Sequence, residues 1–161
     1  MIIRDITFGE LEYDNYDWIK REKETYNFFG VNYEINLKII GRSFEHNESI
    51  KQIQRDTYIK YKNSLEEINL LIEENIYNFY QEECDEYRSM FEEEADILAP
   101  IIRDKKELCN LVKLVCIFIG NDDNNRVLIF VFDTVWDEEG ISVKIINEKV
   151  EAIGGLSEMY I

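Results

Sequence analysis

Apolar and polar residues alternate through most of the first forty positions of the chain. The run VNYEINLKII (residues 31–40) keeps a strict period of two, which is typical of a half-buried antiparallel strand. Two earlier runs alternate more loosely: ITFGELEY (residues 6–13), with a bend at Gly9, and DWIKREKETYNFFG (residues 17–30). Residues 1–42 are therefore predicted to form strands. The buried face of the clearest strand would carry Val31, Tyr33, Ile35, Leu37 and Ile39.

The pattern changes to a helical period in the middle of the chain. Asn47 suits the N-cap of a first helix, and Ser64 with Glu67 matches the capping-box pattern at the start of a second one. Residues 47–96 are predicted to be helical, with at most one break near Cys84. Apolar residues recur at the spacings of three and four that an amphipathic helix requires, at Leu65, Ile68, Leu71, Ile72, Ile76, Phe79, Tyr80, Tyr87 and Phe91.

The last third of the chain returns to strands. LCNLVKLVCIFIG and RVLIFVFDTVW are typical of buried strands, with the polar turn NDDNN between them. GISVKIINEKVEAIGG predicts a third strand and a short return through a tight turn at Asn147 and Glu148. Residues 108–154 thus add C-terminal strands. With no repeat or linker, residues 1–161 are predicted to form a single α+β domain. Its mainly antiparallel sheet would come from the N- and C-terminal segments, with the central helical segment packed on one face.

Charge singles out one part of this plan. The net charge is −16, and residues 63–96 alone hold 12 acidic residues and one basic residue. Within them, YQEECDEYRSMFEEEAD (residues 80–96) holds eight carboxylates and one cation, Arg88. As a helix, this stretch presents an almost purely anionic face to solvent. Its inward side would carry Phe79, Tyr80, Tyr87, Met90 and Phe91.

An acidic chain of this kind excludes some partners. It offers no basic stripe to neutralise phosphates, so no nucleic acid is expected, and an anionic membrane surface would repel it. The most apolar window, residues 111–119, is far too short to cross a bilayer. Residues 1–5 lack the pattern of a secretory signal. Three cysteines without a CxxC pair indicate reduced thiols, so a cytoplasmic location is predicted.

The chemistry of a catalytic or metal site is hard to find in the sequence. His46 stands alone, and no cysteine lies near it, so neither a metal site nor a cofactor is expected. Cys84 lies among carboxylates that disfavour its thiolate. The cluster of Asp133, Asp137, Glu138 and Glu139 has two readings, a divalent-cation or acid–base site and a solvated turn, and its short spacing favours the turn.

Trp136, inside that cluster, likewise has two readings: an exposed partner anchor, or a residue that closes one end of the core, which we favour. No enzymatic activity is expected.

Two stretches resemble a known family. DTVWDEEGISVKIINEKVEAIG (residues 133–154) is similar to the C-terminal signature Trp-Asp-x-Glu-His-Gly of a bacterial family of uncharacterised proteins. IKQIQRDTYIKYKNSLEEINLLIEENIYNFYQEE (residues 50–83) resembles the helical middle of the same family. Members occur beside polymorphic and contact-dependent toxins, which implies an immunity protein. This chain lacks the His expected before Gly140 and has Ser142 where Gly is usual, which favours binding over catalysis.

These observations lead to one functional hypothesis and its alternatives. The chain is expected to be an immunity protein that binds a cognate toxin domain, a basic nuclease being one candidate, and neutralises it stoichiometrically. Alternatives are an acidic nucleic-acid mimic that occupies DNA-binding proteins, a housekeeping protein, and an enzyme using the Trp136 region. The acidic helix also has a plain reading as a solvated face. The predicted partner-binding residues are Tyr80, Glu82, Glu83, Asp85, Glu86, Tyr87, Glu92, Glu93, Glu94, Trp136, Asp137, Glu138 and Glu139.

Overall fold

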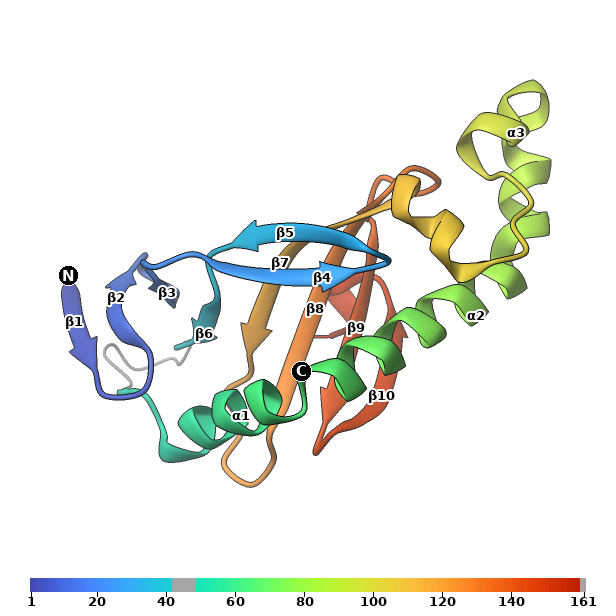
Figure 1. Ribbon diagram of the computed structural model, residues 1–161. Helices are drawn as coiled ribbons and strands as arrows, with labels where there is room; N and C mark the ends of the chain where they lie inside the picture. The colour runs from blue at the N-terminus through green and yellow to red at the C-terminus, as the bar shows by residue number, and fades with distance from the viewer. Residues whose placement is uncertain (42–48, 160–161) are drawn as a thin grey trace.

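A mixed sheet runs through the molecule (Figure 1). The computed structural model describes residues 1–41 and 49–159. Within them, eight strands form one sheet in the order β1-β2-β3-β6-β7-β8-β9-β10. The strands are β1 (Ile2–Asp5), β2 (Gly9–Tyr13), β3 (Asp17–Lys20), β6 (Lys38–Ile40), β7 (Val112–Ile119), β8 (Val127–Thr134), β9 (Ile141–Ile146) and β10 (Lys149–Gly154). N- and C-terminal strands meet where β6 pairs with β7 in parallel, and the other neighbours in this sheet are antiparallel. The predicted α+β class is confirmed.

The run predicted as one strand over residues 31–40 is two strands in different sheets. β4 (Glu24–Phe28) and β5 (Val31–Ile35) form a separate hairpin, and β6 joins the main sheet. Asn36 marks the break, because its side-chain amide donates to the Lys20 carbonyl at 3.0 Å. The predicted single strand is therefore wrong. The alternation still marks the buried side in its second half, at Ile35, Leu37 and Ile39.

Two helices and the hairpin cover one face of the sheet. α1 (Gln52–Asn63) leads through Ser64 into α2 (Leu65–Phe91), and their apolar sides join one core with the hairpin and the sheet. The Ser64 side chain makes no cap hydrogen bond, so the predicted capping box is wrong. α2 continues through Cys84 without a break. The predicted N-cap Asn47 lies outside the described residues. Representative core side chains are Phe28, Ile72, Ile76, Phe130, Phe132 and Val143.

Short helical turns complete the fold. η1 (Glu92–Glu94) and α3 (Ala95–Leu98) follow α2, and η2 (Lys105–Asn110) precedes β7. After β10, η3 (Leu156–Glu158) brings Met159 onto the face of the sheet opposite the helices. There Met159 packs in a second, smaller apolar cluster with Ile40, Phe118, Val127 and Ile129.

Buried charges in the body of the fold have partners. The Glu24 carboxylate accepts hydrogen bonds from the hydroxyls of Tyr58 and Tyr26, the latter at 2.8 Å. Lys20 and Lys62 lie 3.8 and 3.4 Å away from its oxygens. Burial alone raises the Glu24 pKa, but these hydrogen bonds and cations outweigh it and hold the pKa below its ordinary 4.5.

Asp5 follows the same rule. Its carboxylate accepts from the backbone N–H groups of Thr7 and Phe8 and from the Arg55 guanidinium, whose Nη2 lies 2.8 Å away. Burial opposes ionisation, yet these donors hold the Asp5 pKa below its ordinary 3.8. Both carboxylates therefore serve the fold rather than a partner.

Candidate functional site

The last turns of α2 project beyond the sheet, and the chain that follows them folds back along the helix (Figure 1). We call residues 80–102 the acidic arm: the end of α2, η1, α3 and the chain that returns toward η2. At its base, Glu73 of α2 accepts a hydrogen bond from the Phe29 backbone N–H at 2.7 Å and lies 3.6 Å from the Lys105 ammonium. Glu73 thus ties the helix to the hairpin and to η2 where the arm leaves the body.

The arm has a small interior of its own. The Tyr80 hydroxyl donates to the Pro100 carbonyl, and Gln81 donates to the Ile102 carbonyl at 2.9 Å. Cys84 is buried, with its sulfur 3.8 Å from the Ala99 carbonyl oxygen. These contacts hold the returning chain against α2, so the arm presents a defined surface.

Arg88, the cation within residues 80–96, is used inside the arm. Its Nη1 donates to the carbonyls of Ala95 and Ala99 at 3.2 and 2.9 Å, and its Nη2 donates to Asp96 at 2.8 Å. These charge-assisted bonds satisfy backbone carbonyl groups of α3 and of the residue that follows it. Arg88 therefore holds the returning chain against α2. It is not available to neutralise the other carboxylates of the arm.

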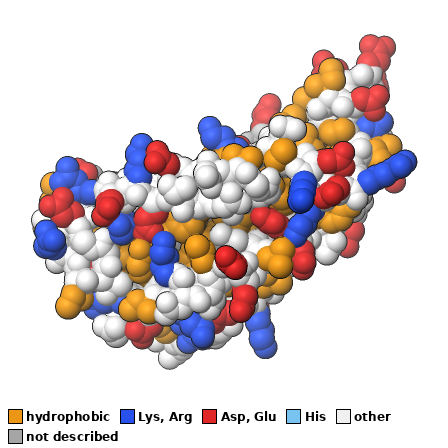
Figure 2. Space-filling model, in the orientation of Figure 1, with side chains coloured by type: hydrophobic (Ala, Val, Ile, Leu, Met, Phe, Trp, Pro, Cys, Tyr) orange, Lys and Arg blue, Asp and Glu red, His pale blue; other side chains and the backbone are white. Residues whose placement is uncertain are grey.

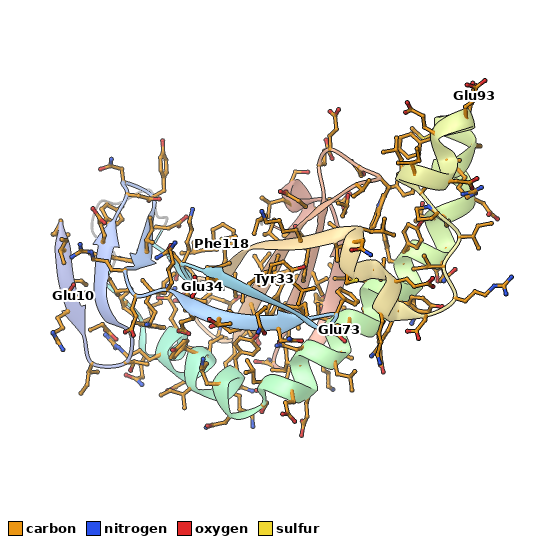
Figure 3. All side chains as sticks on the ribbon, turned by 45° about the horizontal axis from the view of Figure 1, so that its top comes forward. Glu10, Tyr33, Glu34, Glu73, Glu93 and Phe118 are labelled. Carbon is orange, nitrogen blue, oxygen red and sulfur yellow. The ribbon has the colours of Figure 1, made fainter. Side chains whose placement is uncertain are left out.

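Those carboxylates face solvent. Among the described residues none of the predicted glutamates of the arm forms an ion pair, and Glu93 lies at the far end, pointing away from the body (Figure 3). So many like charges in one segment create a strong local negative potential. The exposed members are Glu82, Asp85, Glu86, Glu92, Glu93 and Glu94, while Glu83 is half-buried.

Apolar side chains are exposed between the carboxylates. Met90, Ile97 and Ile101 are 68%, 72% and 67% exposed. Figure 2 shows acidic and apolar atoms side by side on the projecting end. The prediction that Met90 points inward is wrong, because the chain folds back over the opposite side of α2. Sequence reasoning also missed Ile97 and Ile101; the signal was ADILAPII, a run with more apolar residues than so short a turn can bury.

The backbone is strained where α2 ends. Glu92 has φ 53° and ψ −109°, a combination that a residue with a side chain rarely adopts. The strain turns the chain sharply back at the most acidic point of the arm, within three consecutive glutamates. Local strain of this kind persists only where surrounding contacts enforce it, as the Arg88 bonds to α3 do here.

The acidic arm and the turn that carries Trp136 lie against one another. Trp136 is buried, with its ring centroid 4.7 Å from that of Tyr80. The Tyr87 hydroxyl donates to Asp137 Oδ2 at 3.2 Å. Burial, followed by the Asp137 charge, raises the pKa of Tyr87 to about 12. The structure therefore brings the helix and the turn together, although they lie far apart in the sequence.

Burial excludes two of the predicted partner-binding residues as anchors, and it agrees with the favoured reading of Trp136 as a residue that closes the core. Tyr80 is 0% exposed and Trp136 is 3% exposed, so neither is available as an exposed anchor for a partner. Tyr87 is half-buried and keeps an accessible edge. Glu138 and Glu139 are exposed and extend the acidic surface past Asp137.

Three signature positions in the turn after β8, Trp136, Asp137 and Gly140, have a structural explanation. Trp136 closes the core, and Asp137 accepts the Glu139 backbone N–H at 2.9 Å. Gly140 has φ 72°, and a Cβ there would lie 2.2 Å from the Phe132 carbonyl oxygen, so only glycine fits. The turn is thus required by the fold.

Over residues 1–41 and 49–159, no three or more His, Cys, Asp or Glu side chains are grouped in a way that could hold a metal ion. Of the helices in this part of the chain, none is long and apolar enough to span a membrane.

Comparison with protein families gives a match over nearly the whole chain. The model of a family described as a domain of unknown function, DUF6985, matches residues 7–160. No curated protein and no solved structure matches the chain. The matched residues include both the acidic arm and the turn at Trp136, so both lie within this domain.

Proposed function

The chain belongs to the DUF6985 family, and we propose that it is an immunity protein whose acidic arm binds the basic surface of a cognate toxin domain. Binding neutralises the toxin stoichiometrically, in the cytoplasm, and needs no chemistry by this protein. The choice of a toxin as the partner is supported by the resemblance of residues 50–83 and 133–154 to proteins encoded beside bacterial toxins. The arm as the binding surface rests on its geometry.

One observation carries the choice of surface. Glutamates that form no ion pair among the described residues surround exposed apolar side chains on a segment that projects from the body and whose cation, Arg88, is used internally. Each feature has a use in association. The negative potential speeds encounter with a cationic partner, and apolar side chains at the centre of a contact supply affinity. A projecting arm also reaches into a concave partner surface, such as an active-site cleft.

The structural explanation of the turn supports a role in binding. Trp136, Asp137 and Gly140 each satisfy a need of the fold, so the signature requires no catalytic group. Glu138 and Glu139 remain exposed and add to the surface that a basic partner meets.

A pull-down tests the proposal. The tagged protein is mixed with the product of the neighbouring upstream gene, or with native-host lysate, at low and at high salt. One stoichiometric basic partner, released as salt rises, is the expected result. Several DNA-binding proteins displaced by duplex DNA would favour nucleic-acid mimicry instead. A partner whose affinity changes neither with salt concentration nor with substitutions in the arm would contradict the proposal.

Matched charge variants separate the arm from overall acidity. The arm variant neutralises Glu82, Glu83, Glu86 and Glu93 to Gln. The control neutralises four exposed glutamates of the body, Glu12, Glu34, Glu74 and Glu151. Both lose the same net charge. Partner association is expected to slow about tenfold or more in the arm variant, within the range of electrostatic steering, and far less in the control.

A further inference from the structure

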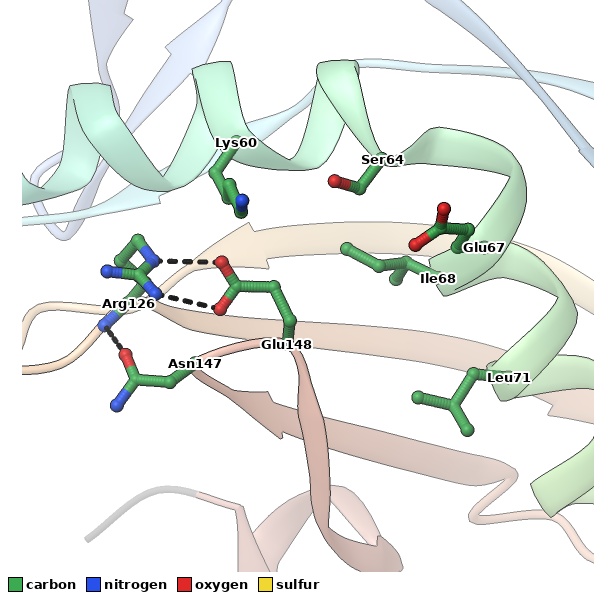
Figure 4. Close-up of a pocket in the computed structure, with 8 residues that line it drawn as sticks. All are labelled: Lys60, Ser64, Glu67, Ile68, Leu71, Arg126, Asn147 and Glu148. Carbon is green, nitrogen blue, oxygen red and sulfur yellow. Dashed lines mark hydrogen bonds and ion pairs between the residues drawn. The ribbon is translucent and has the colours of Figure 1, made fainter.

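The two edge strands of the eight-stranded sheet are built differently. β10, at one edge, carries the exposed charged side chains of Lys149 and Glu151, its register with β9 shifts at Glu151, and α2 packs against it. The turn that leads into β10 is fixed, because Glu148 accepts two hydrogen bonds from the Arg126 guanidinium at 3.0 and 2.9 Å (Figure 4). Charges, bulges and a covering helix are the features that keep an edge strand from pairing with another chain.

β1, at the other edge, has fewer of these features. Among the described residues no strand pairs with its outer side, and its register with β2 is regular. Arg4 is the one exposed charge of β1, and apolar Met1, Ile2 and Ile6 are exposed beside it, Ile6 to 96%. Figure 1 shows β1 as the outermost strand, at the end of the molecule away from the acidic arm. Such an edge is open to pairing with another strand.

The hydrogen bonds of β1 show which of its backbone groups point outward. The Tyr13 backbone N–H donates to the Met1 carbonyl at 3.0 Å, which sets the phase of the pairing between β1 and β2. Antiparallel neighbours exchange hydrogen bonds at every second residue, so the odd-numbered residues of β1 bond to β2. The N–H and C=O groups of Ile2 and Arg4 therefore point away from β2, toward the open edge.

The charge distribution lets two copies of the chain approach through this end without strong repulsion. Residues 1–62 hold 11 acidic and 10 basic residues, a net charge of −1, so almost all of the net charge of −16 lies in residues 63–161. Contact through β1 keeps the two acidic arms at opposite ends of the assembly. Like charges that lie much farther apart than the screening length of about 8 Å in physiological salt repel one another little.

We propose that β1 binds a second copy of this chain, the two β1 strands pairing antiparallel about a two-fold axis at Ile3. Ile2 of each copy exchanges two hydrogen bonds with Arg4 of the other, so the outward groups satisfy one another. The two Ile3 side chains, half-buried and packed on the main core in each copy, meet across the axis. Each copy uses its β1 edge, so the assembly is closed and stops at a dimer. No residue of the acidic arm takes part, and the dimer is independent of toxin binding.

Sedimentation of the native chain tests for the dimer. The purified protein is measured from about 5 to 500 μM, the range of weak association that suits a contact smaller than a standard interface. Its average mass should rise from one chain toward two and no further. A single-chain mass at the highest concentration would overturn the proposal, and loss of toxin binding in Ile2→Pro would then assign the edge to the toxin. Growth beyond two chains would also overturn it.

Proline variants tie the dimer to β1. Ile2→Pro and Arg4→Pro each remove an outward N–H and no bond to β2, a placement that an edge strand tolerates. Each should weaken dimerisation about tenfold or more, because two hydrogen bonds are lost across the axis. Arg4→Ala removes the same side chain but keeps the N–H, and its dimer affinity should stay within about threefold of the native value. Native dimerisation in both proline variants, shown to be folded by circular dichroism, would overturn the proposal.

Amide hydrogen exchange locates the contact without a substitution. At a total concentration about ten times the dissociation constant, about a fifth of the chains remain monomeric by mass action. Exchange of the Arg4 amide should therefore be about fivefold slower than in a dilute sample, because it is protected only in the dimer. The Glu93 amide, in the acidic arm, should exchange at the same rate in both samples. Unchanged exchange at Arg4 in a dimeric sample would place the contact elsewhere and overturn the proposal.

Discussion

The carboxylates of the acidic arm and the carboxylate of Glu24 illustrate opposite treatments of negative charge. Glu24 is 10% exposed in its side chain and is surrounded by two tyrosine hydroxyls and two lysines. The arm glutamates are exposed and have no such partners among the described residues. Compensated charge inside the body fixes the fold. The uncompensated charge on the arm makes no comparable contribution to the fold, and it remains available to a partner.

The comparison predicts opposite responses to mutation. Removing a buried, partnered carboxylate leaves its former partners unsatisfied, which is costly. Removing an exposed carboxylate from a like-charged cluster costs little and relieves repulsion. Substitutions in the two regions test this contrast.

Glu24→Ala should lower the free energy of unfolding by about 3 kcal/mol, because Lys20, Tyr26 and Tyr58 lose their shared partner inside the fold. Urea denaturation followed by circular dichroism measures the change. Glu22→Ala is the control, since that side chain is 88% exposed and lies 3.9 Å from the same Lys20 ammonium. Equal effects of the two substitutions would show that the Glu24 network is not what holds this region.

Acid should weaken the body through the same carboxylate. The folded-state pKa of Glu24 lies below its ordinary 4.5, so its contribution is complete above that value and is lost as the pH falls through the lowered folded pKa. The difference in unfolding free energy between the native protein and Glu24→Gln should therefore be largest near neutral pH and shrink below about pH 4.5. Denaturation at a series of pH values measures it. A difference that stays constant with pH would contradict the assignment.

Glu92→Gly should stabilise the protein by about 1 kcal/mol, because glycine adopts the positive φ of this position without strain. Glu93→Gly removes the same charge from the next residue, which is not in that conformation, and should destabilise the arm slightly. Melting temperatures of the pair separate backbone strain from charge. If both variants shift in the same direction, charge repulsion dominates at the arm's end.

Ser142→Ala should raise the free energy of unfolding by roughly 1 kcal/mol. The Ser142 hydroxyl is buried on β9 and has no hydrogen-bond partner among the described residues. Removing an unsatisfied polar group from the interior is favourable. Ser157→Ala, at an exposed position, should change little by the same denaturation assay. Destabilisation by Ser142→Ala would mean that the hydroxyl has a partner in solution.

Local patterns predicted much of the fold. Periods of two and of three to four located the strands and both long helices, and Asn147-Glu148 was found as a tight turn with β9 and β10 on either side. The division of residues 31–40 between two sheets was not predictable, because hydrogen bonds from Asn36 to a distant strand decide it. The parallel pairing of β6 with β7 is likewise a long-range choice.

The candidate site was predictable in composition and less so in geometry. The run of carboxylates was plain in the sequence. Which side of α2 faces inward after Cys84 depends on the fold-back at Glu92, and that fold-back leaves Met90 exposed.

The acidic arm is expected to serve association and not folding. The most direct measurement compares the arm variant, with Glu82, Glu83, Glu86 and Glu93 changed to Gln, against the native protein in both respects. We expect its unfolding free energy to stay within about 0.5 kcal/mol or to rise, as for exposed substitutions, while association with the basic partner slows about tenfold or more at low salt. Unchanged association with that partner, or a large loss of stability, would contradict the claim.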